Sequence, residues 1–136
     1  MVISNRKMVF QSDIEKVWSV ITDLTHSEWR SDLSRIEVLE TGKQFVEYTK
    51  EGYSTTFTIT VFEPPERYEF DMENGNMSGH WKGVLTKCSN GTAVDFTEEI
   101  EVKKPLMRLF ARIYLKGQQK RYFSDLKSGL GESNTP

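Results

Sequence analysis

From residue 34 to residue 102 the sequence alternates between apolar and polar side chains, and this alternation restricts the fold more than any other feature. A strand reads this way when one face of its sheet is buried and the other meets water. Six strand candidates follow one another: RIEVLE, QFVEYTK, TTFTITVFE, RYEFDM, GHWKGVLTKC and TAVDFTEEIEV. Short connections with glycine, asparagine or proline separate them, which predicts antiparallel neighbours rather than parallel crossovers.

The stretch GVLTKCSNGTAVDFTEE reads as a β-hairpin that places one carboxylate on the apolar face. Asn90-Gly91 is the strongest short turn signal, because a type I′ turn needs positive φ at both central residues. Counting outward from that turn pairs Leu85 with Phe96 and Gly83 with Glu98. Side chains alternate between faces along each strand, so Glu98 should share the face of the aromatic residues. We expect a buried carboxylate with Gly83 leaving room for it.

Helical patterns lie on both sides of the strand region. After a short strand at Lys7–Phe10, Ser12 and Glu15 have the spacing of a capping box, and apolar residues then recur at helical spacing. The stretch THSEWRSDL predicts a second short helical turn that carries Trp29. A long helix is expected from Pro105 to about Gly129.

The long helix has two apolar faces rather than one. Its first half carries Leu106, Leu109, Phe110 and Ile113 on one face, and its second half carries Leu115, Tyr122, Phe123, Leu126 and Leu130 on another. Gly117 lies between them. Either the helix bends at Gly117, so that its first half acts as a lid, or its two halves pack against different things.

These elements predict an α+β fold with one strand, two short helices, six further strands and a long final helix. A curved seven-stranded antiparallel sheet would wrap around the C-terminal helix. The expected division is a single domain at 1–130 and a flexible tail at 131–136. A one-sided sheet covered by so few elements leaves space for a ligand between sheet and helix.

Composition and residue counts argue against several classes of function. The net charge of −2 argues weakly against nucleic acid as a partner. The lone Cys88 excludes an internal disulfide, and without clustered His or Cys residues we expect no metal site and no cofactor. His80 should lie on the wet face of the sheet and His26 in a loop, which disfavours a hydrolytic triad. We see no secretion signal or membrane span, and we expect a cytoplasmic protein.

Over essentially its whole length the chain resembles the START/SRPBCC superfamily, in particular its polyketide cyclase/dehydrase-like and lipid-transfer-like branch. The resemblance rests on DIEKVWSVITDLTHSEWRSDLSRIEVLE, FTITVFEPPERYEF, GTAVDFTEEIEV and KKPLMRLFARIYLKGQQKRYFSDLKSGLGE. It implies the helix-grip fold that the plant pollen-allergen proteins share. It also implies a cavity for an apolar or amphipathic small molecule, although these stretches contain no catalytic signature.

The expected function is binding or carriage of a lipid-, polyketide- or isoprenoid-like molecule between the sheet and the C-terminal helix. The expected ligand-binding residues are Trp29, Phe57, Ile59, Tyr68, Phe70, Trp81, Phe96, Glu98, Phe110, Ile113 and Tyr114. One alternative is a cyclase or dehydratase in which Glu98 is the acid or base, with Tyr68 or Tyr114 as its hydrogen-bond partner. Another is a protein-interaction module that uses the C-terminal helix. The interpretation of Glu98 that requires no ligand is a salt bridge to a basic residue of that helix, or a position near an open rim where water reaches the carboxylate.

The final helix also has an unusual charge distribution. Between Lys103 and Arg121 there are seven basic residues and no acidic one, so a net charge of −2 leaves −9 for the rest of the chain. A solvated helix face is the plain interpretation. Attraction of an anionic ligand group and transient contact with an anionic membrane are the alternatives, and the oligomeric state cannot be read from the sequence.

Overall fold

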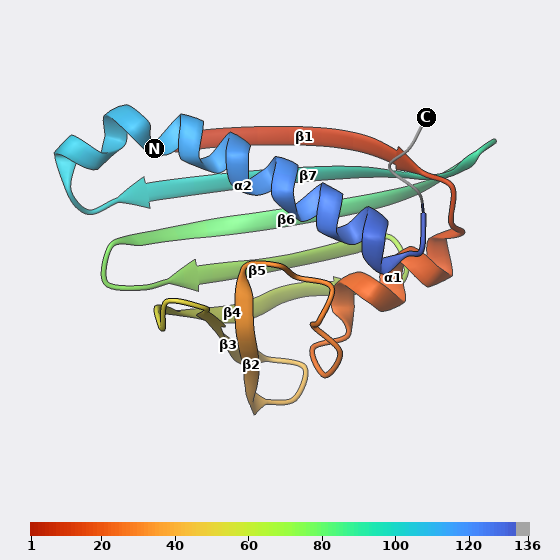
Figure 1. Ribbon diagram of the computed structural model, residues 1–136, viewed down its shortest axis with the longest axis horizontal. Coiled ribbons are helices and arrows are strands. Elements are labelled where there is room, and N and C mark those ends of the chain that lie inside the picture. The colour runs from red at the N-terminus through yellow and green to blue at the C-terminus, as the bar shows by residue number, and fades with distance from the viewer. Residues whose placement is uncertain (133–136) are drawn as a thin grey trace.

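The computed structural model describes residues 1–132, which form one curved sheet with a long helix across one of its faces (Figure 1). The strands are β1 (Val2–Phe10), β2 (Leu33–Glu40), β3 (Gln44–Thr49), β4 (Ser54–Glu63), β5 (Arg67–Glu73), β6 (Met77–Cys88) and β7 (Gly91–Val102). The helices are α1 (Ile14–Thr22) and α2 (Arg108–Gly129), and a single 3₁₀ turn, η1 (Pro105–Met107), precedes α2. The predicted α+β helix-grip fold is confirmed.

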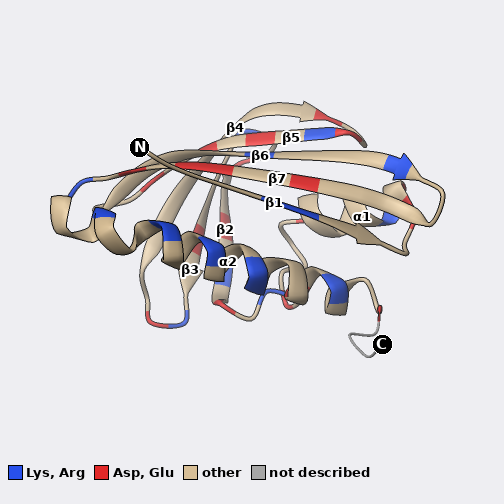
Figure 2. Cartoon of the chain, turned by 90° about the horizontal axis from the view of Figure 1, so that it is seen from above, with Lys and Arg blue, Asp and Glu red and all other residues tan. Residues whose placement is uncertain are grey.

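All seven strands are antiparallel, in the spatial order β1-β7-β6-β5-β4-β3-β2. Strands β2 to β7 are joined as successive hairpins, as the short connections predict, and β1 adds to the free edge of β7. Figure 2 shows α2 on one side of this sheet, so within residues 1–132 a long helix covers only that face. The alternating strand pattern has its physical cause in this arrangement.

The β6–β7 hairpin differs from the prediction by two residues in register. Cys88 pairs with Gly91, so Ser89 and Asn90 form the loop, and Gly91 is a strand residue with a φ of +141°. A side chain at Gly91 would overlap the carbonyl oxygen of Phe10, which explains why glycine is needed there. A shift of two residues leaves every side chain on its predicted face.

The corrected register changes the partner of Glu98. Glu98 pairs with Trp81, and Gly83 pairs with Phe96. A Cβ atom at Gly83 would lie 2.6 Å from the ring of Trp81. Gly83 therefore makes room for the indole ring of Trp81, and the expectation that it makes room for Glu98 is wrong.

Only one helix forms between β1 and β2. Asp13 is the N-cap residue of α1, with its side chain accepting from the amide of Lys16, in place of the predicted Ser12–Glu15 box. The second short helix is not formed, and residues 23–32 are turns. Side-chain carboxylates satisfy the backbone there, since Asp23 accepts from the amide of Thr25 and Asp125 accepts from the amide of Ser31.

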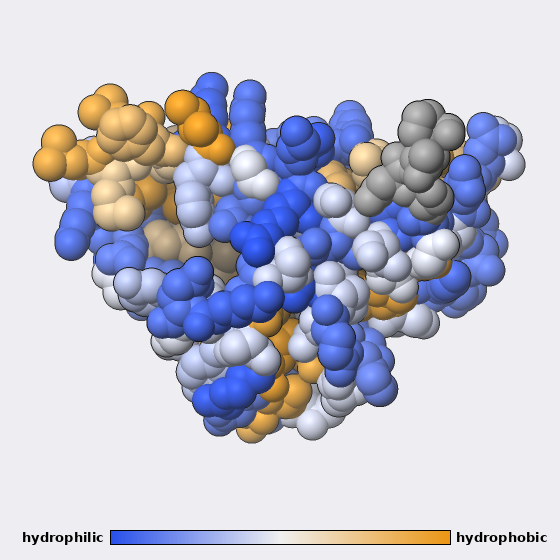
Figure 3. Space-filling view, viewed as in Figure 1, coloured by the Kyte–Doolittle hydropathy of each residue, from blue (hydrophilic) through white to orange (hydrophobic). Residues whose placement is uncertain are grey.

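Helix α2 is continuous through Gly117 and buries one of its two apolar faces. The buried positions are Ala111, Leu115, Gln119, Phe123 and Leu126. The Gln119 side chain accepts a hydrogen bond of 2.8 Å from the hydroxyl of Ser4 and donates one of 3.0 Å to its carbonyl, which fixes α2 against β1. The second apolar face is exposed where the helix begins, and apolar residues gather at that end of the molecule (Figure 3).

Gly117 lies in open space within α2, where nothing lies within 4 Å of a Cβ atom built on it. Gly117→Ala should therefore raise the free energy of unfolding by about 1 kcal/mol, because glycine in a helix is less favourable than alanine by that amount. Urea unfolding measures the change. Gly129→Ala is the matched control, since its Cβ would lie 2.8 Å from the Cβ of Trp29 and should give no gain. A loss of stability in Gly117→Ala would contradict the prediction.

The chain end beyond α2 is anchored as far as it is described. The Glu132 carboxylate accepts hydrogen bonds from the amides of Gln11 and Ser12, at 2.8 and 3.0 Å, and from the Ser12 hydroxyl at 2.7 Å. These bonds hold the pKa of Glu132 below its ordinary value, although burial opposes them. This part of the predicted tail is held against the start of α1, and residues 133–136 lie outside the described residues.

Candidate functional site

The sheet has a hollow on each of its two faces, and the inner one is the candidate site. The outer hollow is an open groove of about 810 Å³. The inner hollow has a volume of about 100 Å³ and lies between the sheet, α2 and the 23–32 turns. Ligand sites are mostly apolar with a few placed polar groups, and the inner cavity has that character.

Aromatic rings from successive strands form the floor of the inner cavity. Phe45 stacks on Phe57 at 4.9 Å between ring centroids, and Phe70 stacks on Trp81 at 4.8 Å. Trp81 lies 4.6 Å from Phe96, beyond the cavity floor. Aromatic pairs at such spacings add stability beyond their buried area. The row makes the floor a rigid surface that extends from β3 to β6.

Arg30 enters the cavity from the 23–32 turns and is held by two carboxylates. Its guanidinium donates to both Asp32 oxygens at 3.2 Å, and to the two Glu47 oxygens at 3.2 and 3.4 Å. The arginine side chain is only 14% exposed, and it lies 5.0 Å from the ring centre of Tyr122. Burial lowers the pKa of Arg30, but Glu47, Tyr122 and Asp32 outweigh burial, so its pKa is raised overall and the charge is permanent.

Glu98 projects from β7 into the same cavity without a partner. Within residues 1–132, no hydrogen bond and no ion pair reaches its carboxyl group, so the salt bridge to α2 considered from the sequence does not form. Burial raises the pKa of Glu98 to about 7, the Arg30 charge lowers it, and Glu47 raises it. At neutral pH the group therefore exists in both protonation states, and it can accept or donate a proton.

Three further side chains give the cavity wall a polar edge. Burial raises the pKa values of Tyr68 and Tyr122 well above the ordinary range, which keeps both hydroxyls protonated. Trp29 lies 5.3 Å from Tyr122 between ring centroids, and its indole nitrogen is buried without a hydrogen-bond partner in the described part of the chain. The site thus combines a flat apolar floor with hydrogen-bonding groups around Glu98.

The structure brings together six of the eleven residues expected to bind a ligand. Those that line the cavity are Trp29, Phe57, Tyr68, Phe70, Trp81 and Glu98. Phe96 and Ile59 pack in or against the core without lining it. The placement of Phe110, Ile113 and Tyr114 in the cavity is corrected, because all three are exposed on the outward face of α2. Tyr114 accepts from Gln118 and is too far out to be the partner of Glu98.

Several lining residues were missed by reading the sequence. They include Ile21, Leu24, Arg30, Ile36, Phe45, Glu47, Met72 and Tyr122. Alternation along QFVEYTK would have placed Phe45 and Glu47 on one face, and Tyr122 lies on the second of the two apolar faces predicted for the long helix. No periodic signal marks Arg30, because it lies in a turn.

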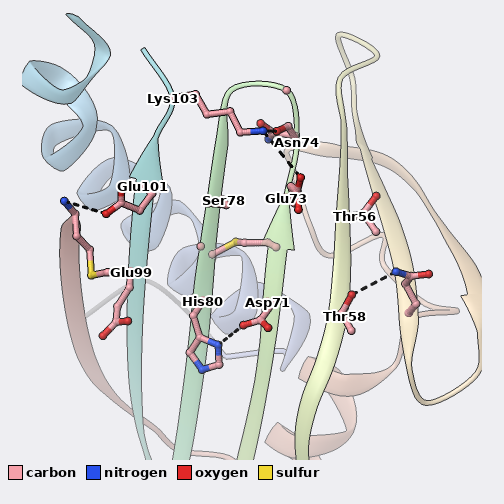
Figure 4. A pocket seen from close by; sticks show the side chains of 15 residues that line it. Thr56, Thr58, Asp71, Glu73, Asn74, Ser78, His80, Glu99, Glu101 and Lys103 are labelled. Atoms are coloured by element: carbon pink, nitrogen blue, oxygen red, sulfur yellow. Dashed lines mark hydrogen bonds and ion pairs between the residues drawn. The ribbon is translucent and has the colours of Figure 1, made fainter. Parts of the chain in front are cut away.

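Several of the polar residues that line the outer groove pair with each other (Figure 4). His80 lies 2.6 Å from Asp71 through Nδ1 and 2.6 Å from Glu69 through Nε2. Burial lowers the pKa of His80, but these two carboxylates raise it more, and the net shift is upward. The prediction that His80 lies on the wet face is confirmed. The described residues hold no group of three or more His, Cys, Asp and Glu side chains suited to a metal ion.

The comparisons with known proteins agree on the fold. The family model described as polyketide cyclase / dehydrase and lipid transport matches residues 1–131. A START superfamily protein from Mycobacterium smegmatis has a TM-score of 0.81 at 13% identity, covering 95% of this chain and 97% of that one. A conserved protein from Geobacillus kaustophilus has a TM-score of 0.79 at 18% identity, with 96% and 95% covered.

A third similar structure is DynU16, a protein in the dynemicin biosynthetic locus. It has a TM-score of 0.77 at 14% identity, and the match covers 95% of this chain but 47% of that one. At these identities the solved structures establish the fold alone. The comparison with curated proteins found no match. Among the described residues, no helix combines the length and apolar character needed to cross a membrane.

The chain belongs to the polyketide cyclase / dehydrase and lipid transport family, because the family model covers nearly its whole length. Membership agrees with the fold and suggests a ligand-related function. It names neither a ligand nor a reaction.

Proposed function

We propose that this protein binds or carries a hydrophobic or amphipathic small molecule, with the polar group of that molecule meeting Glu98 in the inner cavity. The observation that carries the proposal is the unpartnered carboxyl group of Glu98 among aromatic rings. Burying a carboxyl group without a partner costs stability, and sites that bind ligands are where such costs are commonly found. The family to which the chain belongs supports this class of function.

The size of the cavity limits which part of a ligand it encloses. A cavity of about 150 Å³ is known to hold a benzene molecule, and the inner cavity measures about 100 Å³. It therefore accommodates a small polar group or part of one ring, and a longer apolar chain extends out of it. The 23–32 turns form the side of the cavity with the least regular hydrogen bonding. We therefore propose that the cavity opens on this side to let the rest of the ligand extend out.

Glu98→Leu should weaken this binding strongly while leaving the fold intact. The probe is 1-aminoanthracene, a fluorescent uncharged molecule whose amine can donate to the Glu98 carboxylate. We expect saturable binding to the native protein and a dissociation constant at least about tenfold weaker in Glu98→Leu, because a hydrogen bond to a charged group contributes about 1.5–3 kcal/mol. Native mass spectrometry of the freshly purified protein would reveal any ligand that copurifies.

Glu99→Leu is the matched control for this experiment. Glu99 is the next residue of β7 and faces the outer groove, so its replacement removes the same charge from the opposite face of the sheet. The control should bind the probe as the native protein does. Unchanged probe binding in Glu98→Leu would exclude a role for Glu98 in ligand recognition, whatever happens to stability.

The protonation behaviour of Glu98 favours a second candidate function. A pKa of about 7 suits a general acid or base at neutral pH, as a cyclase or dehydratase requires. Tyr68 lines the same cavity and stays protonated, so it is the remaining hydrogen-bond donor of the predicted pair. We rank catalysis below carriage, because the cavity contains no second free acid or base among its described residues.

A further inference from the structure

The exposed apolar face at the start of the long helix has no structural role within the described fold. Its members, which we call the helix-start patch, are Leu106, Met107, Leu109, Phe110, Ile113 and Tyr114. Leu106, Leu109, Phe110 and Ile113 are 80%, 74%, 68% and 72% exposed. Single exposed apolar residues are ordinary, but a contiguous group of this kind marks a site of interaction. Figure 3 shows the group at one end of the molecule.

The helix that carries the patch is held firmly from its other side. Ala111 and Leu115 are buried against the sheet, and Gln119 bonds to Ser4 one turn further along. Because this packing fixes α2, the patch is presented as a rigid surface and does not depend on unfolding of the helix.

Basic residues alternate with the members of the helix-start patch along the chain. Lys104, Arg108, Arg112, Lys116 and Lys120 are all exposed, and none forms an ion pair with another residue of 1–132. The basic residues recur along α2 in Figure 2, and the sequence contains no acidic residue between Lys103 and Arg121. An apolar helix face flanked by unpaired Lys and Arg side chains has the composition of a segment that lies in the interface of an anionic bilayer.

We propose that the helix-start patch docks on the surface of bilayers that contain anionic phospholipids. The apolar side chains would enter the boundary between headgroups and acyl chains, while the flanking cations contact phosphate and carboxylate groups. A nucleic acid would use the cations but not the exposed leucine and isoleucine side chains. A second copy packed patch to patch would bring two sets of like charges together. The proposal does not depend on the ligand of the inner cavity.

Vesicle flotation with the full-length protein tests the proposal. We compare vesicles of phosphatidylcholine alone with vesicles that contain about 30% phosphatidylserine. Binding should be at least about tenfold stronger to the anionic vesicles, and raising the salt from about 0.1 M to about 1 M should weaken it, because salt screens exposed charges. Equal binding to both vesicle types, or none to either, would overturn the proposal.

Two double variants separate the electrostatic and apolar contributions. Arg108→Glu with Arg112→Glu should weaken binding at least about 25-fold, since each cation near an anionic surface strengthens binding about fivefold. Phe110→Ser with Ile113→Ser should weaken binding at low salt as well, through lost apolar burial. Lys7→Glu with Lys87→Glu makes the same charge change at exposed sites toward the other end of the sheet, and it should leave binding within about twofold of the native level if docking is local.

A sedimentation measurement tests the remaining alternative, that a second copy of the chain covers the patch. If the native protein self-associates, if Phe110→Ser with Ile113→Ser converts it to a monomer, and if vesicles do not compete, then a second copy covers the patch and the proposal is wrong. Every altered side chain is exposed, so each variant should keep the fold. Circular dichroism checks this.

Discussion

Replacing Arg30 with methionine should lower the free energy of unfolding by about 3–5 kcal/mol. The guanidinium is the counter-charge for both Asp32 and Glu47, whose side chains are 20% and 14% exposed. Without it, two carboxylates stay in a cavity wall with little access to water. Breaking a buried ion pair in this way costs more than the pair contributed, because the remaining charges are not solvated. Chemical denaturation at neutral pH measures the loss.

The control for Arg30 is an arginine with similar partners on the surface. Arg35 pairs with Glu37 at 3.2 Å and lies 3.8 Å from the ring centre of Tyr48, but its side chain is 58% exposed. Arg35→Met should therefore cost no more than about 1 kcal/mol. Adding Asp32→Asn and Glu47→Gln to Arg30→Met should restore most of the lost stability. An equal cost for the two arginine variants would show that the cavity network is solvated.

The fold was predictable because its signals repeat along the chain. Alternation over six strands and short connections determine an antiparallel sheet, and each hairpin supports the next. The β6–β7 register was missed by two residues because Asn90-Gly91 satisfies the rule for a turn, while Gly91 is required for its close approach to Phe10. Since a register shift of two residues leaves each side chain on the same face of the sheet, Glu98 was still placed correctly on the inner face.

The site was only partly predictable, because half of its polar chemistry comes from a segment without periodicity. Trp29 and Arg30 lie in turns whose path depends on hydrogen bonds from distant residues, such as that from Ser31 to Asp125. The helix was misjudged for a different reason. Burial of Phe110 and Ile113 was inferred from their apolar character, but packing selects the face with Leu115 and Phe123. An apolar helix face shows that contact is favourable and does not show with what.

The stability of this protein should fall as the pH rises from about 4.5 to about 7, and Glu98→Gln should remove that part of the fall. Burial raises the folded-state pKa of Glu98 from 4.5 to about 7, so the folded protein holds this proton more tightly than the unfolded chain. Below pH 4.5 both states are protonated and Glu98 costs nothing in ionisation. Between the two values only the unfolded chain releases the proton, which favours unfolding, and above pH 7 the penalty is constant at about 3 kcal/mol.

The difference in the free energy of unfolding between Glu98→Gln and the native protein tests this prediction. Glutamine cannot ionise, so the variant should match the native protein near pH 4 and exceed it by about 3 kcal/mol at pH 8, in urea unfolding of ligand-free samples. Other ionisable groups contribute equally to both proteins and cancel in the difference. Glu99→Gln should show no such trend, because Glu99 lies on the outer face. A variant that loses stability relative to the native protein as the pH rises would mean that a cation pairs with the Glu98 carboxylate, because only a stabilised carboxylate makes ionisation favour the folded state.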